Sequence, residues 1–366
     1  MRVATLGLIL SACWTTVVAA EQGEDVSPEQ AVARAVAFLA REVPAWPGEN
    51  RCFSCHNNGD AFRALHRAAV AVGEKQLANA PAVPAKSLAA TAAWLAKPEG
   101  WKDNGGEVEF SDKRLATVQF AAALAQIDRA SKPQDDAARP LLAAGQLLVE
   151  QQADDGSWPI DAAGSVGSPA TYGTPLATVM ARAVRHQADP QRFGGAIAKA
   201  DDWLAKFQPQ RVLDAAALLL WLTDTNVKNT ASPQRDQRIA DCVDLIRQGQ
   251  GENGGWGPFA TSAAEPFDTA VVLLALQRLG PAGYRAAIAR LAASDADSAA
   301  KSGAADDWAS MIERGRAYLA ASQYDDGSWP ETTRPAGGES YAQRMSTTAW
   351  VTMALIETGP RMDNKP

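Results

Sequence analysis

The chain has 366 residues, 46% of them hydrophobic, so it can bury a substantial core in one large domain or two ordinary ones. Its formal net charge of −7 excludes the basic footprint expected of a nucleic-acid-binding protein. Beyond the N-terminal segment, no stretch approaches the run of about 18 apolar residues that a membrane-spanning helix needs.

Residues 1–20 have the pattern of a signal peptide: a basic residue, an apolar run, and small residues just before Glu21. We therefore expect cleavage after residue 20, a linker over residues 21–30, and a periplasmic or secreted protein. A lipoprotein box ending at Cys13 is the less favoured alternative, and it would leave Cys13 lipidated.

Two kinds of predicted helix alternate through the rest of the chain. The first kind is partly polar and recurs near residues 33–42, 89–97, 141–151, 198–207, 242–248 and 314–322. The second kind is apolar on most sides and recurs near residues 62–73, 115–127, 175–187, 213–223, 268–279 and 346–358. A helix that is apolar all round is buried, so we predict six helical hairpins with the second helices inside. Residues 281–307 are expected to form an insertion with a short helix, and residues 361–366 a polar tail.

A glycine–tryptophan loop recurs between the helices of several pairs. Residues 152–159 and 323–330 are identical at seven of eight positions, and residues 250–256 are a weaker copy. Glycine ends a helix, and aspartate or serine caps the next one. The simplest role of these loops is therefore structural.

The sequence around the last loop gives the most specific indication of a fold family. A basic residue at 314 and the pair Tyr318-Leu319 are followed by Gln323 and then by Gly327-Ser328-Trp329. This pattern resembles the QW motif of squalene and terpenoid cyclases, whose α/α toroid is shared by protein prenyltransferase β-subunits. The resemblance covers about residues 31–360, and it implies an all-α, (α/α)6 toroid. It says less about activity, because one fold hosts many functions.

The motifs that carry activity in those families are missing. The chain has no Asp-x-Asp-Asp motif for protonating an alkene, and the nearest segment, residues 295–298, lies in the expected insertion. Prenyltransferases hold zinc with an Asp-x-Cys pair and a later histidine. Here an aspartate directly precedes Cys242, and no histidine follows His186. Whether the chain is an enzyme therefore stays open.

The first repeat departs from the others over residues 51–60, where Cys52-x-x-Cys55-His56 takes the place of the glycine–tryptophan loop. This is the attachment signature of c-type heme: two thiols add to the vinyl groups, and the adjacent histidine binds the iron. The neighbouring residues resemble those of bacterial c-type cytochromes, and export agrees, because c-type heme is attached outside the cytoplasm. We predict one heme c, held by Cys52 and Cys55, with His56 as proximal ligand.

Other uses of this motif remain open. A zinc site would need further ligands from Cys242, His66, His186 or carboxylates. A thioredoxin-type redox pair expects a βαβ context, which the helical pattern lacks. A structural disulfide would not require His56, and a vestigial motif would bind nothing.

Two residues are candidates for the distal ligand of the iron. His66 lies ten residues after His56 on the first inner helix, and Met345 precedes the last inner helix, which a closed ring places beside the first. An open or water-bound iron is the third possibility, and it would suit small-molecule binding or peroxide chemistry.

Together these patterns predict an exported heme c protein whose task is electron transfer, docking a redox partner protein or binding a small apolar ligand. One alternative is a heme-dependent enzyme acting on an isoprenoid-like apolar substrate. Another is a binding module with a structural or sensory heme. Three residues are candidates to line a cavity in the toroid, namely Trp221, Asp268 and Trp350.

Overall fold

The computed structural model describes residues 26–74, 77, 81–103, 112–130, 140–160, 169–227, 232–294, 304–334 and 339–360. Within these residues the chain is helical and forms no β-strand, apart from one isolated bridge between Gln250 and Trp256. The predicted all-α class is confirmed. The expected signal peptide, Cys13 and the polar tail at 361–366 lie outside the described residues.

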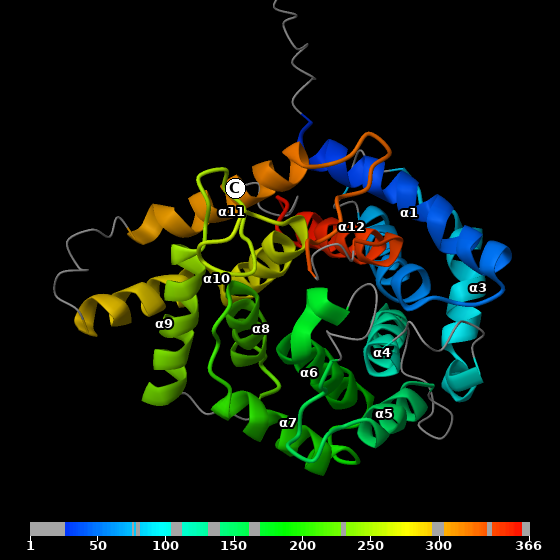
Figure 1. Ribbon diagram of the computed structural model, residues 1–366, viewed down its shortest axis with the longest axis horizontal. Coiled ribbons are helices and arrows are strands. Elements are labelled where there is room, and N and C mark those ends of the chain that lie inside the picture. The colour runs from blue at the N-terminus through cyan, green and yellow to red at the C-terminus, as the bar shows by residue number, and fades with distance from the viewer. Residues whose placement is uncertain are drawn as a thin grey trace, which may run out of the picture.

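The described helices form two layers (Figure 1). The outer layer consists of α1 (Pro28–Asn50), α3 (Ala85–Leu95), α5 (Pro140–Glu150), α7 (Gly194–Lys206), α9 (Pro233–Gln248) and α11 (Ala304–Ala321). The inner layer consists of α2 (Phe62–Gly73), α4 (Lys113–Ala130), α6 (Pro169–Ala188), α8 (Val212–Leu222), α10 (Pro266–Ser294) and α12 (Tyr341–Glu357). Two short segments complete the chain: a π-helix, η1 (Cys55–Ala61), which leads into α2, and a 3₁₀-helix, η2 (Pro98–Asp103).

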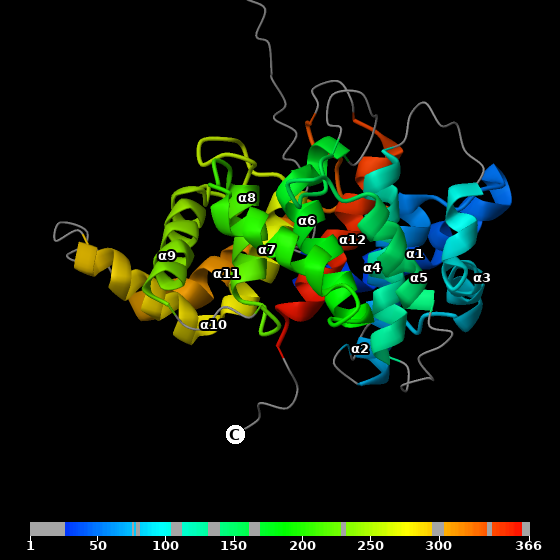
Figure 2. The same ribbon diagram turned by 90° about the horizontal axis from the view of Figure 1, so that it is seen from below.

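The inner helices contact one another in sequence from α4 to α12, and α12 packs against η1 and α2. Since α2 also contacts α4, the chain of contacts returns to its start. Figure 1 looks along the axis of this ring, and Figure 2 shows it from the side.

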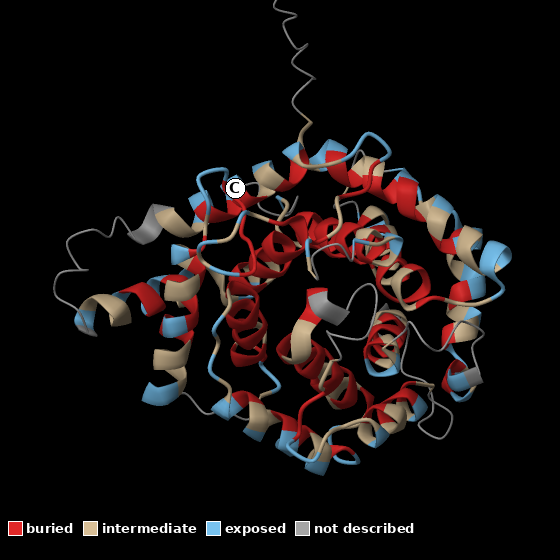
Figure 3. Cartoon of the chain, in the orientation of Figure 1, coloured by how far each residue is buried: buried red, intermediate tan, exposed pale blue. Residues whose placement is uncertain are grey.

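Burial follows the two layers (Figure 3). In α8 every residue except Leu220 is buried, as expected for a helix that is apolar on most sides. Outer helices bury one face only; α7, for example, buries Ile197, Ala200 and Leu204. The sequence pattern therefore separated the inner helices from the outer ones.

Several outer helices begin earlier than the sequence predicts. Helix α1 starts at Pro28, inside the expected linker, because Ser27 and Gln30 form a reciprocal capping box and proline is tolerated in the first helical turn. Helix α9 likewise starts at Pro233, after the capping residue Ser232. The first turns of these helices are polar, so a pattern of hydrophobic residues does not show where the helices begin.

Each glycine–tryptophan loop ties its own repeat to the outer helix of the next one. The Nε2 of Gln323 donates to the carbonyl of Gly327 in its loop (3.0 Å) and to Ala31 of α1 (2.8 Å). Gln152 bridges its loop to α7 in the same way, through Ala196 (2.9 Å). Gln250 reaches α11 through Met311 (3.0 Å). The last of the three loops therefore joins the end of the ring to its beginning.

The tryptophans of these loops are completely buried and pinned by inner helices. The backbone N–H groups of Trp158, Trp256 and Trp329 donate to threonine hydroxyls at distances of 2.8–3.0 Å. The acceptors lie on α6, α10 and α12, and they are Thr178, Thr269 and Thr348. The predicted structural role of the loop tryptophans is confirmed.

Substitution of Gly327 tests the closing loop. Gly327 has φ +91°, and a Cβ there would lie 2.5 Å from the backbone oxygen of Arg34. We expect Gly327→Ala to lower the free energy of unfolding by about 2 kcal/mol or more, measured by denaturant titration. Gly48→Ala is the control, because Gly48 is exposed within α1 and a Cβ there meets nothing within 4 Å. Wild-type stability of Gly327→Ala would contradict this account of the loop.

Candidate functional site

The CxxCH segment is held as a short π-helix. Ser54 caps η1, because its Oγ accepts from the backbone N–H of Asn57 at 3.0 Å. The backbone N–H of Ser54 in turn donates to Oδ1 of Asn58 at 3.0 Å. π-Helical turns are rare and occur frequently at functional sites. Cys55 and His56 are the first two residues of this turn.

Two asparagines fasten the segment to three other helices. The Nδ2 of Asn57 donates to Tyr341 Oη on α12 (2.9 Å) and to the carbonyl of Glu42 on α1 (3.3 Å). The Nδ2 of Asn58 donates to the carbonyl of Val43 (3.1 Å) and to Thr91 Oγ1 on α3 (2.9 Å). Both asparagines are completely buried. The segment is therefore held by helices of the first, second and last repeats.

Neither Cys52 nor Cys55 forms a disulfide, and both are half-buried. Burial, with a smaller effect of the Asp60 charge, raises the pKa of the Cys55 thiol to about 12. Reactive redox cysteines have lowered pKa values, because the thiolate is the nucleophile. This environment therefore does not support a thioredoxin-type redox pair.

The imidazole of His56 lies between aromatic rings. The Trp46 ring approaches it edge-on at 4.9 Å between centroids, Tyr341 does so at 5.7 Å, and these two rings stack on each other. Burial lowers the pKa of His56 to about 3, so the ring is neutral at physiological pH. Its buried Nε2 has no hydrogen-bond partner among the described residues. A neutral imidazole with an unused nitrogen is suited to bind a metal.

The candidate distal ligands lie on two different helices. His66 is on α2 next to Phe62, and burial lowers the pKa of its imidazole. Met345 is completely buried on α12, one helical turn after Tyr341, the residue that contacts His56. Of the two, Met345 therefore follows directly on the helix face that reaches the CxxCH segment.

Asp60 of η1 is the centre of a buried hydrogen-bond cluster that the sequence did not predict. Both Tyr172 Oη and Gln119 Nε2 donate to Asp60 Oδ2, the latter at 2.6 Å, and Trp350 Nε1 donates to Tyr172 Oη at 2.6 Å. Burial raises the pKa of Asp60, whose Oδ1 has no partner among the described residues. The four side chains come from η1, α4, α6 and α12, so the cluster joins distant repeats.

Aromatic rings fill the space next to the cluster. Tyr172 contacts Phe267 at 5.3 Å and Trp350 at 5.8 Å, and all three side chains are buried. Helix α6 kinks at Gly173 (φ 71°), and its first turn lies over the middle of the ring (Figure 1). Trp350, a candidate for lining a cavity, is therefore packed against other aromatic rings.

The other two candidates for lining a cavity have polar partners. Trp221 Nε1 donates to Asp201 of the outer helix α7 at 2.7 Å, so its indole is engaged with the outer layer. Asp268 is completely buried at the start of α10, where Arg334 donates to its Oδ2 at 2.8 Å. Arg334 also lies 3.2 Å from Glu265. Asp268 thus belongs to an ion-pair cluster.

No three His, Cys, Asp or Glu side chains gather in metal-ligand geometry in the part of the chain that the structure describes. A zinc site at the CxxCH segment therefore finds no further ligands there. Among the same residues, no helix has the length and apolar character to cross a membrane.

Comparisons with known proteins give a fold but no family. No family model matches the chain, and no curated protein matches it. A crystal structure of a protein from Actinoplanes has a TM-score of 0.54 at 17% identity, and the match covers 91% of this chain and 99% of that one. A polysaccharide lyase has a TM-score of 0.46 at 12% identity, with coverage of 89% and 96%. The first likeness shows a shared fold alone, and nothing follows from the second.

The titration of Asp268 gives a test of the ion-pair cluster. Burial raises its pKa from 3.8 to about 6, so the folded protein binds this proton more tightly than the unfolded chain. Protonated Asp268 therefore favours the folded state. Its contribution to the unfolding free energy is greatest below about pH 4 and is lost as the pH rises through about 6. We expect the wild type to lose about 2 kcal/mol of unfolding free energy relative to Asp268→Asn between pH 4 and pH 7.5. Denaturant titrations at both pH values measure this change, and a difference independent of pH would refute it.

Proposed function

We propose that the chain is an exported c-type heme protein, built on a toroid of the terpenoid-cyclase type, and that its task is one-electron transfer. The observation that carries the proposal is the buried, unpartnered Nε2 of a neutral His56 beside two cysteines without a disulfide. Sequence spacing and the chemistry of the side chains agree at this point.

The arrangement of the helices supports the toroid part of the proposal. The described inner helices contact one another around a closed circuit, and the last loop bonds to the first outer helix through Gln323. Loops with the QW pattern occupy equivalent places in three repeats. The 1–20 segment supports export.

The described residues fit a covalent heme. Cys52 and Cys55 would tether it, and His56 would bind the iron, while Asn57 and Asn58 hold the segment in place. Bound heme would supply a one-electron iron(III)/iron(II) couple. The rings of Trp46 and Tyr341 pack against the imidazole of His56, and burial lowers its pKa, so the neutral ring would keep its lone pair for coordination.

Electron transfer is favoured over catalysis on an apolar substrate. An enzyme of that kind would need a deep cavity within the ring, and the packing of Tyr172, Phe267 and Trp350 takes up part of that space. A protein that only passes electrons needs a rigid, desolvated site and no substrate cavity. A redox partner protein would then be the other component.

Heme attachment is tested by expressing the full chain in a host with c-type heme maturation. We expect a covalent heme spectrum that survives denaturation of the purified protein. The double variant Cys52→Ser/Cys55→Ser should lose all covalent heme. Cys242→Ser is the matched control and should keep it, because Cys242 is buried on α9. Wild-type protein without covalent heme, produced folded in such a host, would refute the proposal.

The distal ligand is tested with carbon monoxide. For an electron-transfer heme with Met345 as sixth ligand, the reduced wild-type spectrum should not respond to CO, whereas Met345→Ala should respond. His66→Ala should behave like the wild type. The reverse result would assign the position to His66. A wild-type spectrum that responds to CO would indicate an open iron and would contradict the electron-transfer assignment.

A further inference from the structure

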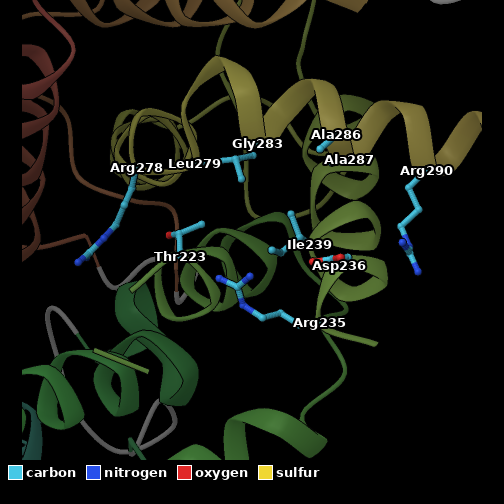
Figure 4. Close-up of a pocket in the computed structure, with 10 residues that line it drawn as sticks. All are labelled: Thr223, Arg235, Asp236, Ile239, Arg278, Leu279, Gly283, Ala286, Ala287 and Arg290. Carbon is cyan, nitrogen blue, oxygen red and sulfur yellow. The ribbon is translucent and has the colours of Figure 1, made fainter. Parts of the chain in front are cut away.

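Residues 281–294, which begin the expected insertion, leave the ring. At Gly280 (φ 69°) helix α10 kinks, and residues 281–294 continue as an arm that runs outward (Figure 1). The arm lies beside the outer helix α9 (Figure 4). The arm is anchored to the outer layer, because Tyr284 is completely buried and its Oη donates to Asp307 of α11 at 2.9 Å.

A cleft lies between the arm, the start of α9 and the end of α8 (Figure 4). Its volume is about 410 Å³, within the range of roughly 300–1,000 Å³ that is typical of ligand sites. It is far from the CxxCH segment in sequence, and no residue of that segment lines it.

One part of the cleft is apolar. Ile239 of α9 and Leu279 of α10 contribute aliphatic side chains, and the arm adds the small residues Gly283, Ala286 and Ala287. Small side chains on the arm keep the space between the two helices open. An apolar chain of modest length fits such a wall.

The other part is strongly basic. Arg235, Arg278 and Arg290 line the cleft, and Asp236 is the one carboxylate among the lining residues. Three positive charges and one negative charge therefore line the cleft, and Figure 4 shows Arg235 between Arg278 on one side and Arg290 on the other. Guanidinium groups bind phosphate and carboxylate groups with paired hydrogen bonds, so this surplus favours an anion.

Arg235 and Arg278 have N–H donors left for a ligand. Arg235 donates from one Nη to the carbonyl of Leu222 (2.5 Å), and its buried Nε has no partner among the described residues. Arg278 is half-exposed, and its ion pair with Asp224 is long, at 3.7 Å. Each guanidinium carries five N–H donors, so these contacts leave donors for a ligand.

We propose that this cleft binds an amphiphilic anion, a phosphate or carboxylate group carried on a short apolar chain. Arg235 and Arg278, which contact the end of α8 or the residues just after it, hold the head group, and the wall formed by Ile239, Leu279 and the arm holds the chain. The proposal is independent of the heme, because none of its residues belongs to the CxxCH segment.

Calorimetry with the purified full chain tests the proposal. The probes are decyl phosphate below its micelle concentration, decanol as the uncharged analogue, and inorganic phosphate. We expect decyl phosphate to bind at least about tenfold more tightly than either of the other two, because each lacks one half of the recognised structure. Vesicles with and without phosphatidic acid distinguish a soluble ligand from a membrane lipid as the source of the same head group.

Three variants locate the binding. Arg278→Gln should weaken decyl phosphate binding by about tenfold, and Ala286→Phe should block it by filling the cleft while leaving the charges in place. Arg285→Gln, on the same arm but outside the lining, is the matched control and should bind like the wild type. Circular dichroism establishes that each variant is folded. Absence of decyl phosphate binding in the wild type, or equal binding by all three folded variants, would overturn the proposal.

Discussion

The architecture depends on one kind of hydrogen bond, which a glutamine side-chain amide makes in each of three repeats. In the three repeats whose two helices are joined by a glycine–tryptophan loop, a glutamine donates both to its own loop and to the outer helix of the next repeat. The two acceptors are backbone carbonyls, so the bond does not depend on which side chains the neighbour carries. Glycine at positive φ lets each loop approach the neighbouring backbone closely. A sequence can therefore vary widely between repeats while the joints between them stay the same.

The first repeat makes the same kind of joint with different residues. Its loop lacks the glutamine and the tryptophan, and two buried asparagines supply the amide donors to α1, α3 and α12. The CxxCH segment thus has a structural frame of its own. Cys52 and Cys55 make none of these amide hydrogen bonds, whereas the imidazole of His56 packs against Trp46 of α1 and Tyr341 of α12.

Much of this could be predicted from the sequence, because the information is local. Apolar runs separated the inner helices from the outer ones, and the identical loops at 152–159 and 323–330 revealed the repeat. The CxxCH spacing singled out its three residues in the same way. Helix starts such as Pro28 were missed, because a capping box carries no hydrophobic signal.

Other features depend on contacts between residues far apart in the chain. Asp60 and Tyr172 are 112 residues apart, and Tyr172 and Trp350 are 178 residues apart, so no local pattern predicts their hydrogen bonds. The direction of the Trp221 indole toward Asp201 is equally invisible in a helix that is apolar on most sides. The basic cleft arises because the arm of α10 folds against α9.

The bond between Gln323 and Ala31 also sets the order in which the molecule can be completed. These residues are 292 positions apart, so helix α1 waits for its final partner until nearly the whole chain has been made. Until then the first repeat is open on one side, at the side where α12 will cover the CxxCH segment. In the closed ring Cys52 and Cys55 are half-buried, so a factor that acts on this segment would reach it more easily before the ring closes. Closing the ring then covers the side of the segment that α12 contacts, so the last step of folding also fixes the surroundings of His56.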